Sequence, residues 1–123
     1  PPNCTAVFCR DVPATGATVR MGRLLDGVAP HMLDQPEART FVPASAPEPD
    51  RAEVVGALRG TGAEVLMNYL PVGSQKATEF YAECALEAGV AFVNCIPVFI
   101  AREPYWQQRF IDRGLPIVGD DVK

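Results

Sequence analysis

The sequence predicts an α/β fold with a mostly parallel sheet. Three short apolar runs, at 65–67, 90–93 and 115–118, have the length and composition of strands that are buried on both faces. Each run follows a segment in which apolar residues recur at helical spacing. Because parallel strands are joined by long crossovers that are usually helices, this alternation favours a parallel sheet with helices on both faces.

The first helix is predicted to begin after Asp50, because Glu53 follows three residues later in the spacing of a capping box. Gly60 and Gly62 end the helical pattern, since glycine is a poor helix former. The apolar run that follows is predicted to be a strand ending at Asn68. The apolar residues of the helix, spaced for one face, are Val54, Val55 and Leu58.

The second helix is predicted between Ser74, as its N-cap, and Gly89, which terminates it. The strand that follows is expected to run from Val90 to Val93 and to end at Asn94. Apolar residues three and four positions apart define the buried face of this helix: Ala77, Phe80, Tyr81, Cys84, Ala85 and Ala88.

The third helix is predicted over 103–113, and Gly114 closes it. Its buried side is expected to carry Trp106, Phe110 and Ile111. The last strand, 115–118, then leads into a glycine and two acidic residues. The predicted sheet therefore has three strands whose ends are all followed by polar residues.

The first fifty residues give weaker signals. Runs at 5–9 and 18–21 are rich in β-forming residues and predict two short strands with a turn between them. Prolines at 36, 43, 47 and 49 predict a loop or connection over 34–50. With 123 residues in all, the chain fits a single domain.

Charge and hydropathy exclude several classes of function. The net charge of −4 gives no basic surface for a phosphate backbone, so nucleic acid is not an expected partner. The most apolar stretch, 90–101, is too short to span a bilayer, and we expect no membrane partner. No export signal precedes it, so the expected location is the cytoplasm.

The cysteine and histidine residues do not form a metal-binding pattern. Cysteines at 4, 9, 84 and 95 include no CxxC pair, and His31 is the single histidine. Cys84 and Cys95 are expected to be small buried apolar residues. His31 is expected to lie on the surface.

Polar residues at the three strand ends are the candidate site. Asn68, Asn94 and the pair Asp120 and Asp121 each follow a predicted strand, and Lys123 comes shortly after. The carboxyl ends of parallel strands share one edge of a sheet, where ligands bind in open α/β folds, so this set predicts a binding cleft. Alternatively, each asparagine caps a turn or helix, and the two acids form a solvated turn.

Three motifs carry a resemblance to a known family: NYLPVGS at 68–74, AFVNCIPVFIA at 91–101 and PIVGDDVK at 116–123. In this order they resemble the shorter, prokaryotic branch of the myo-inositol-1-phosphate synthases. The resemblance implies a Rossmann-like NAD-binding domain, of which residues 1–123 would be an incomplete part. The first strand, the glycine-rich loop and the catalytic and oligomerising domain would lie outside this chain, whose sequence contains no GxGxxG motif.

The resemblance also implies an activity, cofactors and site residues. Family members convert glucose 6-phosphate to an inositol phosphate with tightly held NAD, in inositol and phospholipid biosynthesis, as homo-oligomers for which we expect a tetramer. Lys123 would be catalytic, polarising the substrate oxygen that becomes a carbonyl. Asp120 or Asp121 would help to bind a divalent or monovalent cation of unknown identity. The implied NAD contacts are Asp26, Gly27, Asn68, Pro71, Val72, Gly73, Ser74, Asn94, Cys95, Pro97 and Asp120.

Two other interpretations compete with this one. The chain is alternatively a stand-alone α/β module that binds a nucleotide or a partner without catalysis. A short-chain dehydrogenase is disfavoured because the sequence lacks both GxGxxG and a Tyr/Lys pair at helical spacing. Without the phosphate-binding glycines, we expect the isolated chain to bind NAD poorly, to lack turnover and, with an exposed sheet edge, to aggregate.

Overall fold

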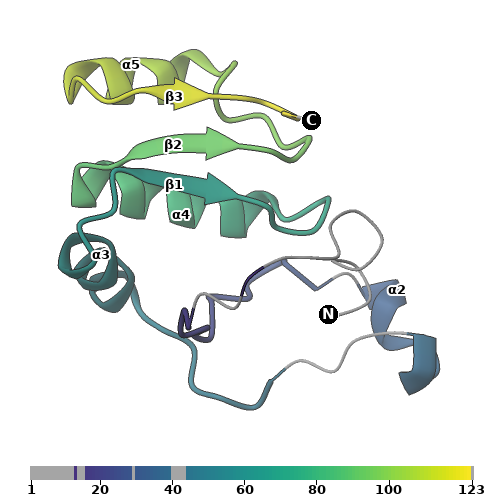
Figure 1. The fold of residues 1–123 in the computed structure, drawn as a ribbon. Coiled ribbons are helices and arrows are strands. Elements are labelled where there is room, and N and C mark those ends of the chain that lie inside the picture. Colours follow the sequence, from purple (N-terminus) through teal and green to yellow (C-terminus); the bar gives the residue numbers. More distant parts are fainter. Residues whose placement is uncertain (1–12, 14–15, 29, 40–43, 123) are drawn as a thin grey trace.

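A three-stranded parallel sheet forms the centre of the protein. The computed structural model describes residues 13, 16–28, 30–39 and 44–122 (Figure 1). Strands β1 (Val65–Asn68), β2 (Ala91–Asn94) and β3 (Ile117–Val118) are hydrogen-bonded in the order β1-β2-β3, all parallel. The predicted α/β class, an incomplete Rossmann-like sheet, is confirmed.

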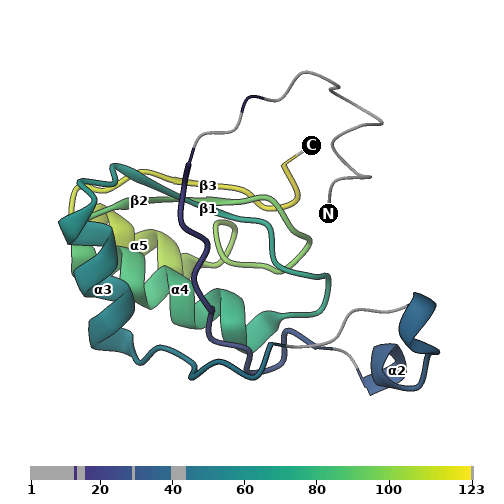
Figure 2. The ribbon, with the colours of Figure 1, turned by 60° about the horizontal axis from the view of Figure 1, so that its bottom comes forward.

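Three helices cover one face of this sheet: α3 (Arg51–Gly60), α4 (Gln75–Ala88) and α5 (Pro104–Asp112). All three lie on the same side of the strands (Figure 2). Within the described part of the chain no helix lies on the other face, where the side chains of Val65, Met67 and Val118 are each about half exposed. The expected second layer of helices is therefore not formed by the described residues.

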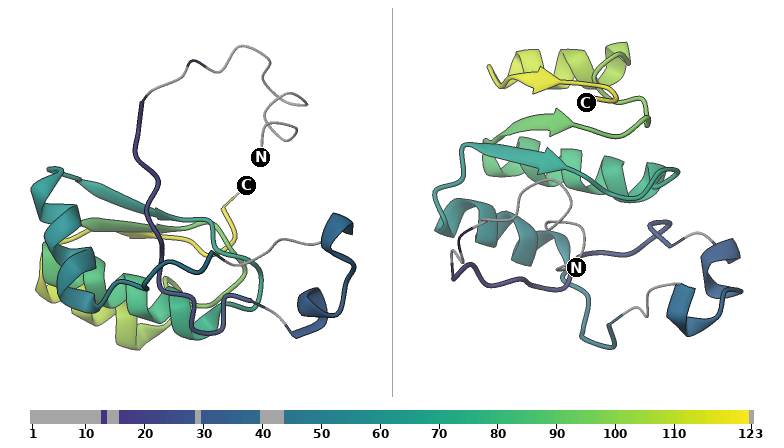
Figure 3. Two further views of the ribbon diagram at one scale, coloured as in Figure 1. Left: turned by 90° about the horizontal axis from the view of Figure 1, so that it is seen from below. Right: turned by 45° about the vertical axis from the view of Figure 1, so that its right-hand side comes forward.

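The segment before α3 is irregular. It contains the short helix α2 (Pro30–Leu33), which carries the exposed His31, and the 3-10 turn η1 (Glu37–Arg39). The strand expected at 18–21 is wrong, because these residues pair with no strand and Val19 is 94% exposed. Figure 3 shows this segment passing beyond the β1 side of the sheet. The strand expected at 5–9 lies outside the described residues.

Helix α3 begins as its sequence predicts. The backbone N–H of Glu53 donates to Asp50 Oδ1 at 2.8 Å, and the backbone N–H of Asp50 donates to Glu53 Oε2 at 2.9 Å. This reciprocal pair is the predicted capping box. The helix ends at Gly60, and of its residues Val55 is fully buried. Its start and its end were both predictable from local sequence.

Helix α4 begins and ends where predicted, but its N-terminus is not capped by the predicted side chain. Gly89 closes it in the left-handed conformation, with φ of 79°. Ser74 occupies the N-cap position, but its hydroxyl donates to the carbonyl of Pro71 at 2.6 Å and bonds to no helix N–H. The buried face also differs from the expected one, because α4 packs on both the sheet and α3, and the expected Phe80, Tyr81 and Ala88 are only half-buried. The buried residues of the helix are Ala77, Thr78, Ala82, Cys84, Ala85 and Leu86.

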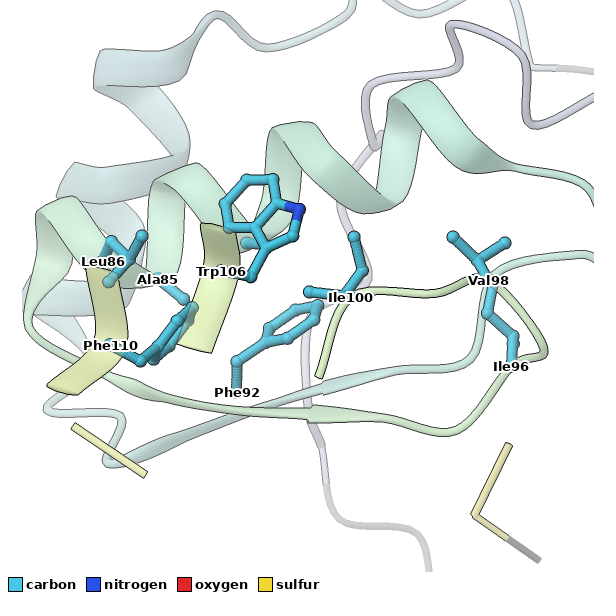
Figure 4. Close-up of a cluster of buried hydrophobic side chains, with 9 residues drawn as sticks. Ala85, Leu86, Phe92, Ile96, Val98, Ile100, Trp106 and Phe110 are labelled. Atoms are coloured by element: carbon cyan, nitrogen blue, oxygen red, sulfur yellow. The ribbon is translucent and has the colours of Figure 1, made fainter. Parts of the chain in front are cut away.

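The hydrophobic core lies between the sheet and helices α4 and α5 (Figure 4). Phe92 of β2 and Phe110 of α5 are both fully buried, with ring centroids 6.4 Å apart. Trp106 is buried one helical turn before Phe110, as predicted, whereas Ile111 is 68% exposed and was wrongly assigned to the core. The contacts of α5 are made by the i, i+4 pair, and the next position has already turned toward solvent.

The two described cysteines are buried, as predicted. Burial raises the pKa of the Cys84 thiol to about 11, so this group stays protonated near neutral pH. Cys95 lies just after β2 with little exposed surface. Cys4 and Cys9 lie outside the described residues.

Candidate functional site

The three strand ends meet, as the parallel topology requires. Asn68 and Asn94 are register partners in β1 and β2, and Asp120 follows β3. Asn68 Nδ2 donates to Asn94 Oδ1 at 2.8 Å, and Asn94 Nδ2 donates to Asp120 Oδ1 at 2.7 Å. We call these three residues the strand-end triad. The predicted juxtaposition of polar residues at this edge is therefore present.

Both N–H protons of the Asn68 amide are used within the protein. Its Nδ2 group also donates to Thr78 Oγ1 at 3.2 Å, and its Oδ1 accepts from the backbone N–H of Leu70 at 3.2 Å. An amide nitrogen has only two protons to donate, so a ligand would have to displace one of these partners. The side chain holds the turn that follows β1.

Asn94 is enclosed more completely, with no exposed surface. Besides its bonds to Asn68 and Asp120, its Nδ2 group donates to the carbonyl of Val98 at 2.6 Å. Buried amides need such partners, because an unpaired polar group in the interior costs about 1 to 3 kcal/mol. For both asparagines the structure shows the turn-holding role that the sequence had left open as an alternative.

The carboxylate of Asp120 accepts hydrogen bonds from the loop that follows β2. The backbone N–H of Ile100 lies 3.1 Å from each carboxylate oxygen. The N–H groups of Ala101 and Arg102 lie 3.0 Å from Oδ1 and 3.4 Å from Oδ2, respectively. Successive backbone N–H groups around one carboxylate form a small anion-binding nest. Here the occupant is a side chain of the same protein.

Gly119 allows β3 to approach the end of β2. A Cβ atom at this position would lie 2.8 Å from the carbonyl oxygen of Asn94, and its φ of 150° is unfavourable for other residues. The glycine of the GDD motif thus has a steric reason, which the sequence alone does not reveal.

The exposed part of the site is the loop after β1. Tyr69 is 72% exposed, and its pKa is raised, first by hydrogen bonding to the Cys95 side chain and then by the negative charge that Cys95 carries as a thiolate. Of the implied NAD contacts at this edge, the exposed ones are Pro71, Val72, Gly73 and Pro97, and the buried ones are Asn68, Ser74, Asn94 and Cys95. The expected catalytic Lys123 lies outside the described residues.

Asp26 and Gly27 lie at the N-terminus of α4. They belong to a turn closed by the backbone N–H of Gly27, which donates to the Leu24 carbonyl at 2.7 Å. Asp26 accepts from the backbone N–H groups of Lys76 at 2.8 Å and Ala77 at 2.9 Å. Asp26 therefore caps the helix that Ser74 was expected to cap. No local signal could have shown this, because cap and helix are about fifty positions apart.

The electrostatics of Asp26 follow from these bonds. Partial burial acts to raise its pKa, but the hydrogen bonds from Lys76 and Ala77 outweigh this, and the pKa lies below its ordinary value of 3.8. The charged form is thus favoured at the helix N-terminus, where the backbone dipoles also attract anions.

Two further hydrogen bonds hold the segment that carries this turn. The hydroxyl of Tyr81, in α4, accepts from the backbone N–H of Arg23 at 2.7 Å. Glu48 accepts from the N–H of Leu24 at 3.1 Å. These polar contacts attach residues 23–27 to the helical layer.

Several cavities lie in the described structure, and one of about 280 Å³ is lined by Gly27, Leu70 and Pro71, between the Asp26 turn and the loop after β1. One of about 430 Å³ lies between α3 and the segment that includes Arg20 and Met21, with Tyr81 in its wall. A smaller one of about 170 Å³ beside β1 reaches Asn68 and Tyr69. Over 13, 16–28, 30–39 and 44–122, no three His, Cys, Asp or Glu side chains gather as a metal site would require.

The fold and this edge define a class: an incomplete Rossmann-like α/β domain with a polar site at the carboxyl ends of parallel strands. No protein-family model matches the chain. It is 49% identical over 121 residues to the inositol-3-phosphate synthase of Corynebacterium glutamicum, covering 98% of this chain and 31% of that protein. The enzyme of that name from Mycolicibacterium smegmatis is 49% identical over 113 residues, covering 92% of this chain and 29% of that protein.

The chain is therefore homologous to a segment of the inositol-3-phosphate synthases, and the resemblance read from its motifs is confirmed. It spans about a third of the length of these curated relatives. Among solved structures, the crystal structure of Ari2 matches with a TM-score of 0.58 and 46% identity, covering 59% of this chain and 22% of that one. In the part of the chain that the structure describes, no helix has the length and hydropathy needed to cross a membrane.

Proposed function

We propose that this chain forms part of the NAD-binding domain of an inositol-3-phosphate synthase, which converts glucose 6-phosphate to an inositol phosphate in the cytoplasm. The observation that carries the proposal is the 49% identity that extends over 121 of the 123 residues. The motifs at the three strand ends lie within this match.

The proposed NAD site lies along the carboxyl ends of β1 and β2. Exposed groups there are the main chain at 71–73 and the ring of Pro97, while the asparagine amides behind them are already paired. Gly73, with φ of 92° and open space around its Cα, leaves room for a ligand to approach the backbone. The residues present therefore fit a ligand held mainly by main-chain and apolar contacts. NAD bound there would supply the hydride acceptor and donor.

Lys123 follows the GDD motif and is proposed to polarise the reacting oxygen of glucose 6-phosphate. An ammonium group beside that oxygen stabilises negative charge as it develops there and can transfer a proton. The homo-oligomeric state and the cation requirement of the whole enzyme belong to the same proposal.

The test uses the full-length protein that contains this sequence. We expect it to form inositol phosphate from glucose 6-phosphate with NAD, and we expect Lys123→Ala to lower kcat by about 10²- to 10⁴-fold, the usual contribution of a general acid or base. The matched control is Lys76→Ala. Lys76 is the other lysine of the chain; its side chain is exposed, and its backbone bond to Asp26 survives the substitution.

Loss of activity in the Lys123 variant with retained activity in the Lys76 variant would support the proposal. A wild-type protein that binds NAD but forms no inositol phosphate would contradict it and would favour the non-catalytic nucleotide-binding module.

A further inference from the structure

The carboxylate of Asp120 has little capacity left for a ligand. Oδ1 accepts from Asn94 Nδ2 and from the N–H groups of Ile100 and Ala101, and Oδ2 accepts from those of Ile100 and Arg102. A carboxylate has about four lone-pair sites, so these donors fill it. Because every donor presents a proton to the carboxylate, a cation placed here would meet positive ends of dipoles.

The same contacts fix the chain that leaves β3. Gly119 packs against the backbone of Asn94, and the backbone N–H of Asp121 donates to the Ile96 carbonyl at 3.2 Å. Three consecutive residues, 119–121, are thus attached to the end of β2 and the loop after it. Lys123 is two positions further along the sequence.

Asn94 connects this attachment to the rest of the sheet. It accepts from Asn68 on one side and donates to Asp120 on the other, so the ends of β1, β2 and β3 are joined by side chains. Its third bond, to Val98, fixes the start of the loop whose N–H groups hold Asp120. No hydrocarbon side chain could both accept and donate in this way, and a carboxylate would lack the donors.

We propose that Asp120 is a positioning residue aligned by Asn94, which fixes the segment leading to Lys123, and that it does not itself ligate the cofactor or a cation. The inference rests on the proposed function for the role of Lys123. It replaces the direct NAD or cation contact that the family resemblance implied for Asp120.

The test compares three variants of the full-length protein: Asp120→Asn, Asn94→Asp and the double exchange. In the first, an amide nitrogen replaces one carboxylate oxygen and faces N–H donors. In the second, two carboxylates face each other. In the double exchange the bond between positions 94 and 120 is restored with its direction reversed, because the amide introduced at position 120 can donate to the carboxylate introduced at position 94, while the bond to the Val98 carbonyl is lost. Asp34→Asn, which removes an exposed acid from the segment before α3, is the control.

We expect each single variant to lower kcat at least tenfold while the Kd for NAD and the cation concentration at half-maximal rate stay within twofold of wild type. The double exchange should recover at least fivefold in kcat over Asn94→Asp, because an amide at position 120 removes the repulsion between two facing carboxylates. A residue that ligates NAD or a cation would behave differently: its loss would raise the Kd or the cation requirement about tenfold, without rescue by the exchange, and that result would overturn the inference.

A second readout does not depend on catalysis. Lys123 is labelled with an amine-reactive ester and quantified by peptide mass spectrometry, with Lys76 as the internal reference. We expect Asp120→Asn to change the labelling rate of Lys123 at least threefold, with Lys76 unchanged. An unchanged rate at Lys123 would refute the positioning role. If the wild type lacks synthase activity, the proposed function fails, and the labelling result still decides this inference.

Discussion

Residues 50–122 and residues 16–28 are held in this protein by different means. The first region is a layered α/β unit in which Phe92, Ile100 and Phe110 have no exposed surface. The second has no regular strand or helix and is attached by a few polar contacts at Arg23, Leu24 and Asp26. The comparison shows that the family motifs after position 65 lie in a unit with its own core, whereas the earlier segment depends on α4 for its position.

The largest expected effect comes from the core of the layered unit. Phe92→Ala should lower the free energy of unfolding by about 3 to 5 kcal/mol, because it removes a fully buried ring and leaves a cavity. Val19→Ala, in the irregular segment, should change it by less than about 0.5 kcal/mol. Chemical denaturation of both variants measures the difference. Equal losses of unfolding free energy in the two variants would contradict the idea that the two regions are held by different means.

Next in size is the close approach of β3 to β2. Gly119→Ala should cost about 1 to 3 kcal/mol, because its Cβ would meet the Asn94 carbonyl oxygen at 2.8 Å. Gly56→Ala is the matched control, since Gly56 lies in α3 with nothing within 4 Å of a Cβ atom. That change should stabilise by about 0.5 to 1 kcal/mol. A thermal midpoint that falls in both variants would contradict the steric explanation.

The attachment of the irregular segment should respond to a smaller change. Asp26→Ala should cost about 1 kcal/mol, the usual value of a lost helix cap, and should release residues 23–27 from α4. Faster hydrogen exchange at the Lys76 and Ala77 amides, with no change at β2, would sharpen the comparison. The exposed acid Asp34 provides the control substitution, Asp34→Ala.

The smallest effect concerns pH and the helical layer. Glu83 in α4 makes ion pairs with Arg51 and Arg109, and the hydrogen bond from Arg109 holds its pKa below the ordinary value of 4.5 despite partial burial. A carboxylate whose pKa is lower in the folded state than in the unfolded state stabilises the fold at pH values above its unfolded-state pKa. This stabilisation is lost as the pH falls through the folded-state pKa. Glu83→Gln should therefore cost about 0.5 to 1 kcal/mol at pH 7 and nearly nothing at low pH.

The measurement is urea denaturation of wild type and Glu83→Gln from pH 7 down to about pH 3. The two curves should converge in acid. A gap that stays constant, or widens in acid, would show that the ion pairs are not its source.

The open face of the sheet carries apolar side chains that are exposed in the structure. Val65 and Met67 lie on the open face of β1 and are about half exposed, although the apolar sequence of this strand predicts burial on both faces. The sequence pattern thus predicts a sheet covered on both faces, whereas the residues in the structure cover one face. It accords with a chain that spans about a third of its curated relatives.

The sequence by itself determined the elements whose signals are local. The capping box of Asp50 and Glu53, the left-handed Gly89 and the apolar runs of the strands need only neighbouring residues, so α3, α4 and the three strands were predictable. Parallel order also follows from the helical crossovers, and it correctly brought Asn68, Asn94 and Asp120 to one edge.

Only the tertiary structure decided how those residues are used. Which lone pairs and N–H groups remain for a ligand depends on partners far away in sequence: Asp120 on the Ile100 loop, Asn94 on Asn68, and the N-terminus of α4 on Asp26. Hydrogen bonding is directional and saturable, so one distant donor changes a candidate ligand into a structural acceptor. Hydrophobic periodicity carries no information about such pairings, and for this reason the juxtaposition of the three side chains was predictable from sequence while their hydrogen-bond partners were not.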